Sequence, residues 1–209
     1  MVMACGLLAM PVSGQEGDTF LAALPVVSSP SPMPSPDTLR DTFAGSREAT
    51  RSPAEVWAAR QWVNTMAPRL AGRMPDPARH QTLLTRIYHE ARLAGLSPEL
   101  VLAVIQVESA FQAEAVSSAG AVGLMQIMPF WIRELGLPAD DLKDPQRNLR
   151  YGCTILAHYL AVEDGDLTRA LARYNGSLGK TWYPERVMRA LSRHWSPVSP
   201  AAMPVTAGR

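Results

Sequence analysis

The chain has 209 residues, of which 47% are hydrophobic, and this suits one domain with tails better than two full domains. Its 20 Lys and Arg nearly balance its 19 Asp and Glu, and no run of basic residues stands out. The sequence therefore argues against nucleic-acid binding through an overall basic charge, although a local patch can still hold an anionic polymer.

The N-terminal segment, residues 1–24, has the character of an export leader. Residues 1–14 form a short apolar stretch that ends in small residues, as a secretory signal does, although no positive segment precedes it. The residues before Cys5 also resemble a lipobox, so a lipoprotein is the alternative. Both interpretations predict a periplasmic or envelope-associated protein, and no segment has the roughly 18 apolar residues that a membrane span needs.

Two further segments are predicted to lie outside the folded domain. Residues 25–51 begin with a tract rich in Pro and Ser and then stay polar, which is typical of a flexible linker. Residues 196–209 have a similar composition and are predicted to form a disordered tail. This leaves a helical extension over residues 52–78 and a main domain over residues 79–195.

The folded part contains only helical patterns. Ser52, Ser97 and Asp144 each precede a proline, an arrangement that caps a helix and then starts it. Apolar residues follow these positions at helical spacing. Further helices are predicted to begin near Pro77, Asp166 and Tyr183. Since no alternating pattern competes, the predicted fold class is all-α, and the extension is predicted to form an extra N-terminal helix.

Cysteine and histidine usage predicts no metal site. Cys5 and Cys153 are far apart, and the four histidines are scattered without a cysteine pair beside them. Cys153 lies inside a helical pattern, where a single cysteine is usually a small buried hydrophobe.

The predicted helix that begins at Pro98 is apolar nearly all round and ends in Glu108. A helix without a polar face is normally buried. Burial raises the pKa of a carboxyl group, so Glu108 can hold a proton near neutral pH and donate it to a leaving group. The alternative is a glutamate that only caps the helix or pairs with an arginine, and position alone does not decide between them.

The segment that follows, residues 117–129, combines small and apolar residues. Gly120 and Gly123 allow the backbone to approach a ligand or another element closely. Gln126 is a polar side chain between apolar ones. The alternative is a tight turn into another core helix, with Gln126 bonded to backbone groups.

Four motifs, in order and at matching spacing, resemble those of the soluble lytic transglycosylases, whose catalytic domain is similar to goose-type lysozyme. They are Glu108-Ser109-Ala110-Phe111, Ser117, Gly123-Leu124-Met125-Gln126 and Tyr174-Asn175-Gly176. Between the last two motifs, Asp144, Asn148, Gly152 and Leu156 resemble a helix of the same family. The resemblance implies a lysozyme-like helical catalytic domain over residues 79–195 with a groove for a glycan strand.

The resemblance also implies roles for single residues. Glu108 falls at the catalytic acid/base position, and Ser109 is expected to fix the end of the helix. The implied substrate-binding residues are Ser117, Gln126, Met128, Tyr174 and Asn175. Among these, Tyr174 falls at an aromatic hydroxyl close to the catalytic carboxylate. Tyr183 resembles a late tyrosine of the family, at a position that suits the core equally well.

Two departures from the family pattern concern loop geometry. Arg173 stands where the family often has alanine before the Tyr-Asn pair. Gln112 and Ala113 stand where it often has Asn-Pro. Both departures affect the expected subsite details and leave the implied reaction unchanged.

The activity implied by the resemblance is cleavage of the β-1,4 bond between MurNAc and GlcNAc with formation of 1,6-anhydro-MurNAc. Retaining glycosidases use two carboxyl groups about 5 Å apart, but Glu114, Asp140 and Asp141 do not fall at matching positions. Glu108 would therefore act alone as general acid and base, without metal or cofactor.

Two alternatives share the predicted substrate, peptidoglycan glycan strands. One is a muramidase of the same fold that uses water as acceptor. The other is an inactive glycan-binding component of an envelope machine. In each case we expect a monomer that does not bind nucleic acid. General wall turnover and local wall opening, with a secretion or conjugation apparatus as partner, both suit the sequence.

Overall fold

The computed structural model describes residues 52–74, 76–134 and 142–196. Within these ranges the chain is helical, without a named strand, so the all-α prediction is confirmed. The predicted leader and linker lie outside the described residues, as do Asp140, Asp141 and the predicted C-terminal tail from residue 197 on. Ser196, the first residue of that tail, is described, and its carbonyl oxygen accepts a hydrogen bond from Arg69.

The described helices follow one another with short connections, apart from one long loop. In order they are α2 (Pro53–Ala71), α3 (Pro77–Leu93), α4 (Pro98–Glu108), α5 (Pro129–Glu134), α6 (Pro145–Val162), α7 (Leu167–Asn175), α8 (Trp182–Ala190) and the π-helical turn η2 (Leu191–Trp195). The long loop, residues 109–128, joins α4 to α5. The sequence patterns predicted six of these helices and missed α5 and η2.

Local capping explains where the helices begin. The side chains of Ser52, Ser97, Asp144 and Asp166 each accept a hydrogen bond from a backbone N–H three residues on, at 2.8 to 3.2 Å. Each cap satisfies one of the four donors that a helix start leaves open. The predicted Ser-Pro and Asp-Pro starts are therefore confirmed.

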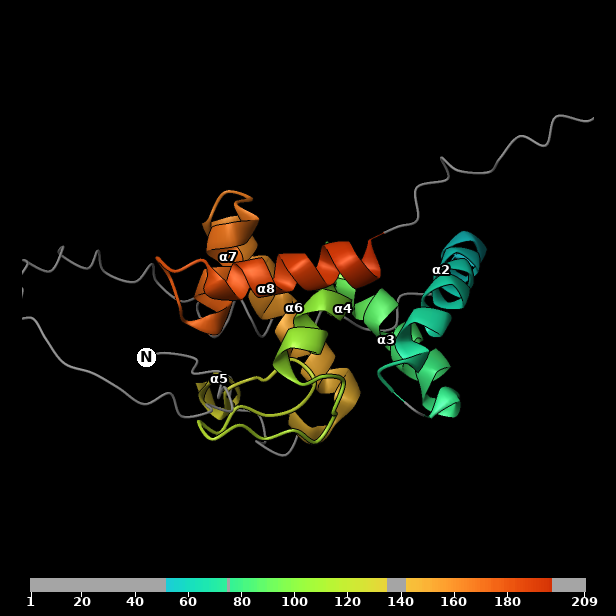
Figure 1. The fold of residues 1–209 in the computed structure, drawn as a ribbon, viewed down its shortest axis with the longest axis horizontal. Helices are drawn as coiled ribbons and strands as arrows, with labels where there is room; N and C mark the ends of the chain where they lie inside the picture. Colours follow the sequence, from blue (N-terminus) through green and yellow to red (C-terminus); the bar gives the residue numbers. More distant parts are fainter. Residues whose placement is uncertain (1–51, 75, 135–141, 197–209) are drawn as a thin grey trace, which may run out of the picture.

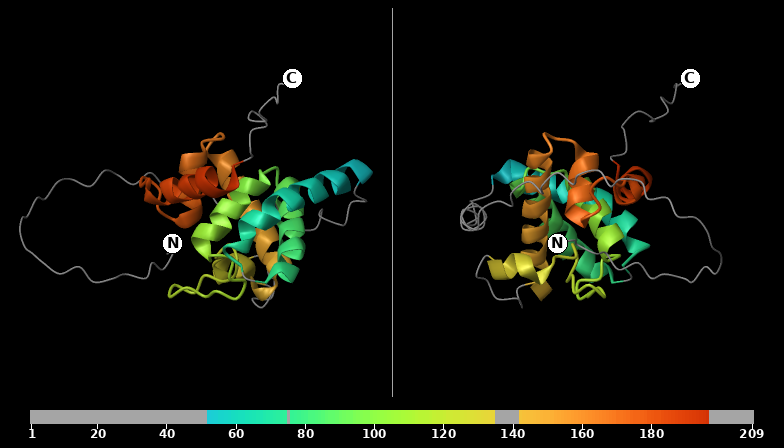
Figure 2. Two further views of the ribbon diagram at one scale, coloured as in Figure 1. Left: turned by 45° about the vertical axis from the view of Figure 1, so that its right-hand side comes forward. Right: turned by 90° about the vertical axis from the view of Figure 1, so that its left-hand side faces the viewer.

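The core is built around α4. Six consecutive residues of this helix, 100–105, are at most 6% exposed, as the all-apolar pattern predicted. Helices α3 and α8 and the turn η2 pack against α4. Figures 1 and 2 show α2 at one end of the molecule and α7 with α8 at the other, with the loop that follows α4 below this helix in Figure 1.

The extra helix α2 is tied to the rest of the fold at several points. Val63, Met66 and Leu70 are buried, and α2 packs along α3. The indole of Trp62 donates a 2.8 Å hydrogen bond to Glu99 at the start of α4. Trp57 belongs to the predicted apolar stripe but is 65% exposed, because the first turns of α2 extend past α3 (Figure 2).

A bidentate ion pair joins α3 to α6. The guanidinium of Arg150 donates to both carboxylate oxygens of Glu90, at 2.8 and 3.0 Å. Glu90 is 5% exposed, and the hydrogen bond to this partner is the largest cause of a raised pKa at Arg150. Because the paired oxygens and nitrogens satisfy each other, this buried charge is compatible with the apolar core around it.

Candidate active site

Glu108 is the last residue of α4 and is half-buried. The hydroxyl of Tyr183, in the first turn of α8, donates a 2.5 Å hydrogen bond to its Oε1. Tyr183 itself is fully buried. The carboxylate therefore lies where the end of the central helix meets the start of α8, and its orientation is fixed by a rigid aromatic side chain.

The backbone turns sharply after Glu108. Ala110 and Phe111 both have positive φ angles, 49° and 68°, which is uncommon for residues other than glycine and rare for an aromatic one. The ring of Phe111 is buried and packs edge-on against Trp195, with the ring centroids 5.7 Å apart. Such local strain is held by surrounding packing and tends to occur at functional sites.

Ser109 fixes the end of α4. Its hydroxyl donates to the carbonyl oxygen of Leu124 at 2.8 Å and lies 3.3 Å from that of Ile105. It is 7% exposed. The expectation that Ser109 holds the helix end is therefore confirmed, and the bond to Leu124 also ties the helix to the loop.

The loop itself is held by Asn148 of α6. This fully buried side chain accepts a hydrogen bond from the backbone N–H of Met125 at 2.9 Å and donates to the carbonyl oxygens of Val122 and Leu142. Gly123 has a φ of +81°, and a Cβ there would clash with Asn148. Gly123 is therefore needed for the close approach of the loop to α6. The sequence left open whether the backbone approaches a ligand or another element, and here it approaches another element.

Gln126 and Ser117 also bond to the loop backbone. The amide nitrogen of Gln126 donates to the carbonyl oxygens of Ala115 and Gly123 at 3.2 and 3.0 Å, and the side chain is 6% exposed. The hydroxyl of Ser117 accepts from the N–H of Ala121 at 3.0 Å. Both side chains shape the loop in this structure, and contact of either with substrate stays a prediction.

Met128 and Asn175 lie at the edges of this region. Met128 is half-buried and packs against the core just before α5. Asn175 ends α7 and is 4% exposed. Their predicted contacts with glycan stay untested.

Tyr174, which the resemblance places at an aromatic hydroxyl close to the catalytic carboxylate, is fully buried. Its hydroxyl donates to the carbonyl oxygen of Met125 at 2.7 Å. Burial raises the pKa of Tyr174, and the charge of Glu108 adds to this effect. The hydroxyl in hydrogen-bond contact with Glu108 is that of Tyr183, which the sequence could not separate from a core residue.

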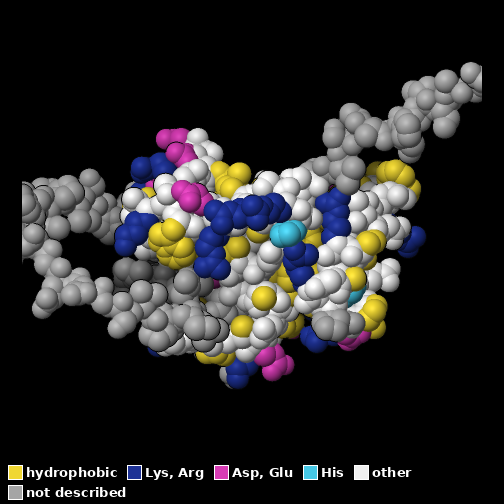
Figure 3. Space-filling model, in the orientation of Figure 1, with side chains coloured by type: hydrophobic (Ala, Val, Ile, Leu, Met, Phe, Trp, Pro, Cys, Tyr) yellow, Lys and Arg dark blue, Asp and Glu magenta, His cyan; other side chains and the backbone are white. Residues whose placement is uncertain are grey.

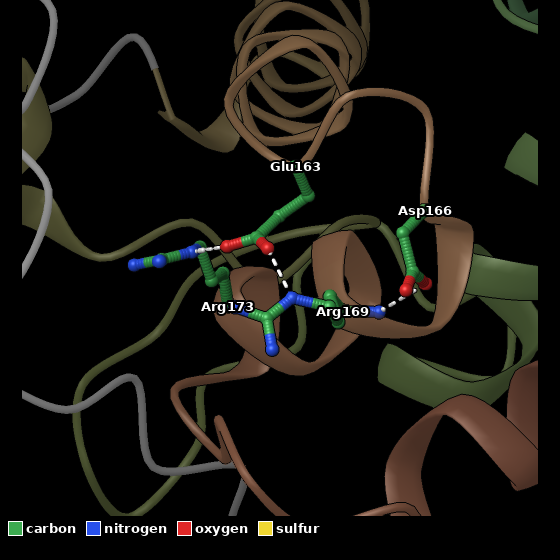
Figure 4. Close-up of polar contacts among 4 residues, drawn as sticks. All are labelled: Glu163, Asp166, Arg169 and Arg173. Atoms are coloured by element: carbon green, nitrogen blue, oxygen red, sulfur yellow. Dashed lines mark hydrogen bonds and ion pairs between the residues drawn. The ribbon is translucent and has the colours of Figure 1, made fainter.

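Arg173, the departure from the family pattern beside Tyr174, takes part in an ion-pair cluster at the end of α6 (Figure 4). The Nε atoms of Arg169 and Arg173 each donate to one carboxylate oxygen of Glu163. The hydrogen bond from Arg173 is the main cause of a lowered pKa at Glu163. The cluster joins the end of α6 to α7 and so holds the helix that carries Tyr174.

Aromatic side chains near the motifs divide into core and surface. Trp131 is only 2% exposed and packs against Phe130 and Tyr159. Trp182, next to Tyr183, is 38% exposed. Of these two indole rings, Trp182 is the one that faces solvent.

The part of the chain that the structure describes contains no group of three or more His, Cys, Asp or Glu side chains arranged to hold a metal ion. None of the described helices combines the length and the apolar character needed to cross a bilayer. Cys153 is buried, and desolvation raises the pKa of its thiol.

Curated proteins with similar sequences are transglycosylases. A transglycosylase of Enterobacteria phage PRD1 is 33% identical over 53% of this chain and 43% of its own length. The endo-type membrane-bound lytic murein transglycosylase A of Klebsiella pneumoniae is 37% identical over 35% of this chain and 39% of its own. The chain therefore spans less than half the length of these relatives.

A solved structure and a protein family are also similar to this chain. An inactive mutant of the lytic transglycosylase Slt of Pseudomonas aeruginosa matches with a TM-score of 0.40 and 22% identity, over 69% of this chain and 32% of that one. Residues 87–193 match the family described as the transglycosylase SLT domain. Because this match covers just over half of the 209 residues and includes Glu108, Tyr174 and Tyr183, the chain belongs to the transglycosylase SLT domain family.

Proposed function

We propose that this protein is a peptidoglycan lytic transglycosylase in which Glu108 is the single general acid and base. Family membership supports the reaction class. The observation that carries the residue assignment is the half-buried carboxylate of Glu108, held by the hydroxyl of Tyr183 where α4 meets α8. A carboxyl group that is partly shielded from water and fixed in direction suits proton transfer to a bound leaving group.

The proposed reaction runs in two proton transfers at one residue. Protonated Glu108 donates to the oxygen of the bond between MurNAc and GlcNAc, and this bond breaks while the 2-acetamido group of MurNAc stabilises the positive charge at C1. The ionised Glu108 then takes the proton of the MurNAc 6-hydroxyl, whose oxygen bonds to C1. The product is 1,6-anhydro-MurNAc, the carboxyl group regains its proton, and no metal, cofactor or water takes part.

The loop after α4 and Tyr183 have supporting roles in this proposal. Asn148, Ser109 and Tyr174 all bond to the backbone between residues 122 and 125, and so fix the loop next to the end of α4. Ser117, Gln126, Met128 and Asn175 are proposed to contact the glycan from this loop and from the end of α7. Tyr183 is proposed as a positioning residue, because it contacts Glu108 directly.

The proposed place of action is the cell envelope, where peptidoglycan lies. The export leader predicted over residues 1–24 supports this, and relatives from Klebsiella pneumoniae are named membrane-bound lytic murein transglycosylases A and C. General wall turnover and local wall opening for a secretion or conjugation apparatus both fit this proposed place of action.

Digestion of purified sacculi with mass analysis of the products tests the proposed reaction. A lytic transglycosylase releases muropeptides that end in 1,6-anhydro-MurNAc. Reducing ends instead of anhydro ends would identify a muramidase with water as acceptor. Binding to sacculi without release of any fragment would identify an inactive glycan-binding component, and either result would overturn the proposal.

A further inference from the structure

The outer face of α8 and η2 carries a stripe of arginines. Arg186, Arg189 and Arg193 follow each other at intervals of three and four residues, which places them on one face of a helix. All three are exposed. Figure 3 shows Lys and Arg side chains gathered on the face along which α8 runs in Figure 1. With a net charge of only +1 for the chain, this is a local concentration of positive charge.

The arginines line a cavity of about 210 Å³ between α8 and α4. Its described lining residues are Gln106, Val107, Arg186, Arg189, Ala190, Arg193 and His194, with no acidic side chain among them. Within the described ranges, the three guanidinium groups have no carboxylate partner. We call this feature the arginine cavity. Guanidinium groups without partners, gathered at a cavity, favour an anionic ligand.

A further positive charge reaches the same place from another helix. Arg73, just after α2, lies over the ring of Trp195 at 5.2 Å from its centre. The pKa of His194 is lowered by partial burial and by the charges of Arg73 and Arg193. The positive charge around the cavity therefore comes from arginines on separate elements.

The arginine cavity adjoins the part of α4 that ends in the proposed catalytic carboxylate. Val107, which lines the cavity, directly precedes Glu108 on α4, although Glu108 itself is not among the lining residues. On the other wall, Arg186 follows Tyr183 by three residues, and the Tyr183 hydroxyl contacts Glu108. A ligand that extends from Glu108 along α8 therefore meets the first of the arginines, Arg186, within one helical turn of Tyr183 and the other two further along.

We propose that the arginine cavity binds the carboxylates of the peptide stems of peptidoglycan, so that the protein selects stem-bearing glycan over bare glycan. This assignment rests on the proposed function, because the stem is attached to the lactyl group of the MurNAc whose bond is cleaved beside Glu108. Sugar hydroxyls do not require several arginines, whereas each free stem carboxylate matches one guanidinium fork. A flat anionic lipid surface does not match the shape of a cavity, and nothing in the proposed reaction brings it close to Glu108.

The test compares two substrates and two triple variants. The substrates are intact glycan strands with peptide stems and the same strands after the stems have been removed by an amidase. The cavity variant carries Arg186→Gln, Arg189→Gln and Arg193→Gln. The control variant carries Arg60→Gln, Arg92→Gln and Arg133→Gln, which removes the same charge from exposed positions elsewhere. Thermal unfolding establishes that both variants are folded.

We expect the cavity variant to lose about tenfold in kcat/KM on stem-bearing strands, since it lacks the charge-assisted hydrogen bonds to the stem carboxylates. On bare strands it should match the control variant. Equal loss on both substrates, or no loss on either, would overturn the assignment. The loss should shrink as salt is added, because exposed charges are screened.

A binding experiment separates this assignment from the proposed function. Free stem peptide, without sugar, is titrated into the wild-type protein and both variants by calorimetry. Saturable binding of the stem peptide that only the cavity variant loses supports the assignment. This holds even if the wild-type protein cleaves neither substrate; that result would overturn the proposed function and leave the assignment of the cavity standing. Binding to vesicles of anionic phospholipid with no binding of stem peptide would overturn the assignment in favour of a membrane contact.

Discussion

The end of α7 and the start of α8 each supply a fully buried tyrosine, but the two hydroxyls have different partners. Tyr174 donates to the backbone oxygen of Met125 at 2.7 Å, whereas Tyr183 donates to the carboxylate of Glu108 at 2.5 Å. Sequence motifs favoured Tyr174 as the hydroxyl beside the catalytic glutamate. The structure gives Tyr174 a contact that holds the loop and gives Tyr183 the contact with the carboxyl group.

This difference shows what a motif can and cannot predict. A motif states which residue types occur at which spacing, and the Tyr-Asn-Gly motif correctly marked the end of a helix close to the site. Which of two tyrosines reaches a given oxygen depends on how α7 and α8 pack against each other and on α4. The two tyrosines should therefore respond differently to the same small change, removal of the hydroxyl.

The largest expected effect comes from Asn148, which, like Tyr174, bonds to the backbone of Met125. Asn148→Ala removes hydrogen bonds to Met125, Val122 and Leu142. The carbonyl oxygen of Val122 keeps its bond from the N–H of Ile127, but the N–H of Met125 loses its buried acceptor. We expect the free energy of unfolding to fall by about 3 to 5 kcal/mol, since each unsatisfied group costs about 1 to 3 kcal/mol. Urea unfolding measures this, and a loss below about 1 kcal/mol would contradict the role given to Asn148.

Tyr183→Phe should act on turnover. Loss of the hydrogen bond to Glu108 is expected to lower kcat by about 10-fold to 100-fold, because hydrogen bonds to charged groups contribute about 1.5 to 3 kcal/mol. KM should change little, because the bond is made to the enzyme's own carboxyl group and not to substrate. An unchanged kcat would reduce Tyr183 to a core residue.

Tyr174→Phe should act on stability instead. The carbonyl oxygen of Met125 would lose its buried donor, and we expect a loss of about 1 to 2 kcal/mol in the free energy of unfolding. Combined with Asn148→Ala, the two losses should not add, since both side chains hold the backbone of Met125. If Tyr174→Phe lowered kcat more than Tyr183→Phe, the distinction between the two tyrosines would be reversed.

The smallest expected effect concerns how stability depends on pH through the ion pairs of Glu163 with Arg169 and Arg173. Glu163 has a lowered pKa in the folded chain, so its ion pairs stabilise the fold above the ordinary value of 4.5 for this group. This contribution is lost as the pH falls from there through the lowered folded value. Glu163→Gln should therefore unfold at lower temperature than wild type at pH 7, and the difference should narrow in acid. A difference that grew in acid would contradict the assigned ion pairs.

The helical framework could be predicted because its signals are local. Ser52, Ser97, Asp144 and Asp166 cap helices through bonds that span only three residues, so the sequence alone contains both partners. The burial of α4 followed from its unbroken apolar composition in the same way.

The parts that could not be predicted depend on distant partners. The short helix α5 has few residues and no apolar period to reveal it, and the positive φ angles of Ala110 and Phe111 are imposed by packing around them. The bond from Trp195 to Gln106 and the bond from Tyr183 to Glu108 join positions that are 89 and 75 residues apart. Sequence patterns of one chain carry no signal for such contacts.

The central claim is that one carboxyl group, at the end of α4, both donates and accepts the proton in glycan cleavage. Its most direct test is the rate of anhydro-muropeptide release from sacculi by Glu108→Gln beside Glu114→Gln, which changes an exposed glutamate six residues on. We predict that Glu108→Gln lowers this rate at least about 100-fold, while the protein stays folded and bound to sacculi, and that Glu114→Gln keeps wild-type turnover. Anhydro-muropeptide release by Glu108→Gln at a rate close to wild type would contradict the account.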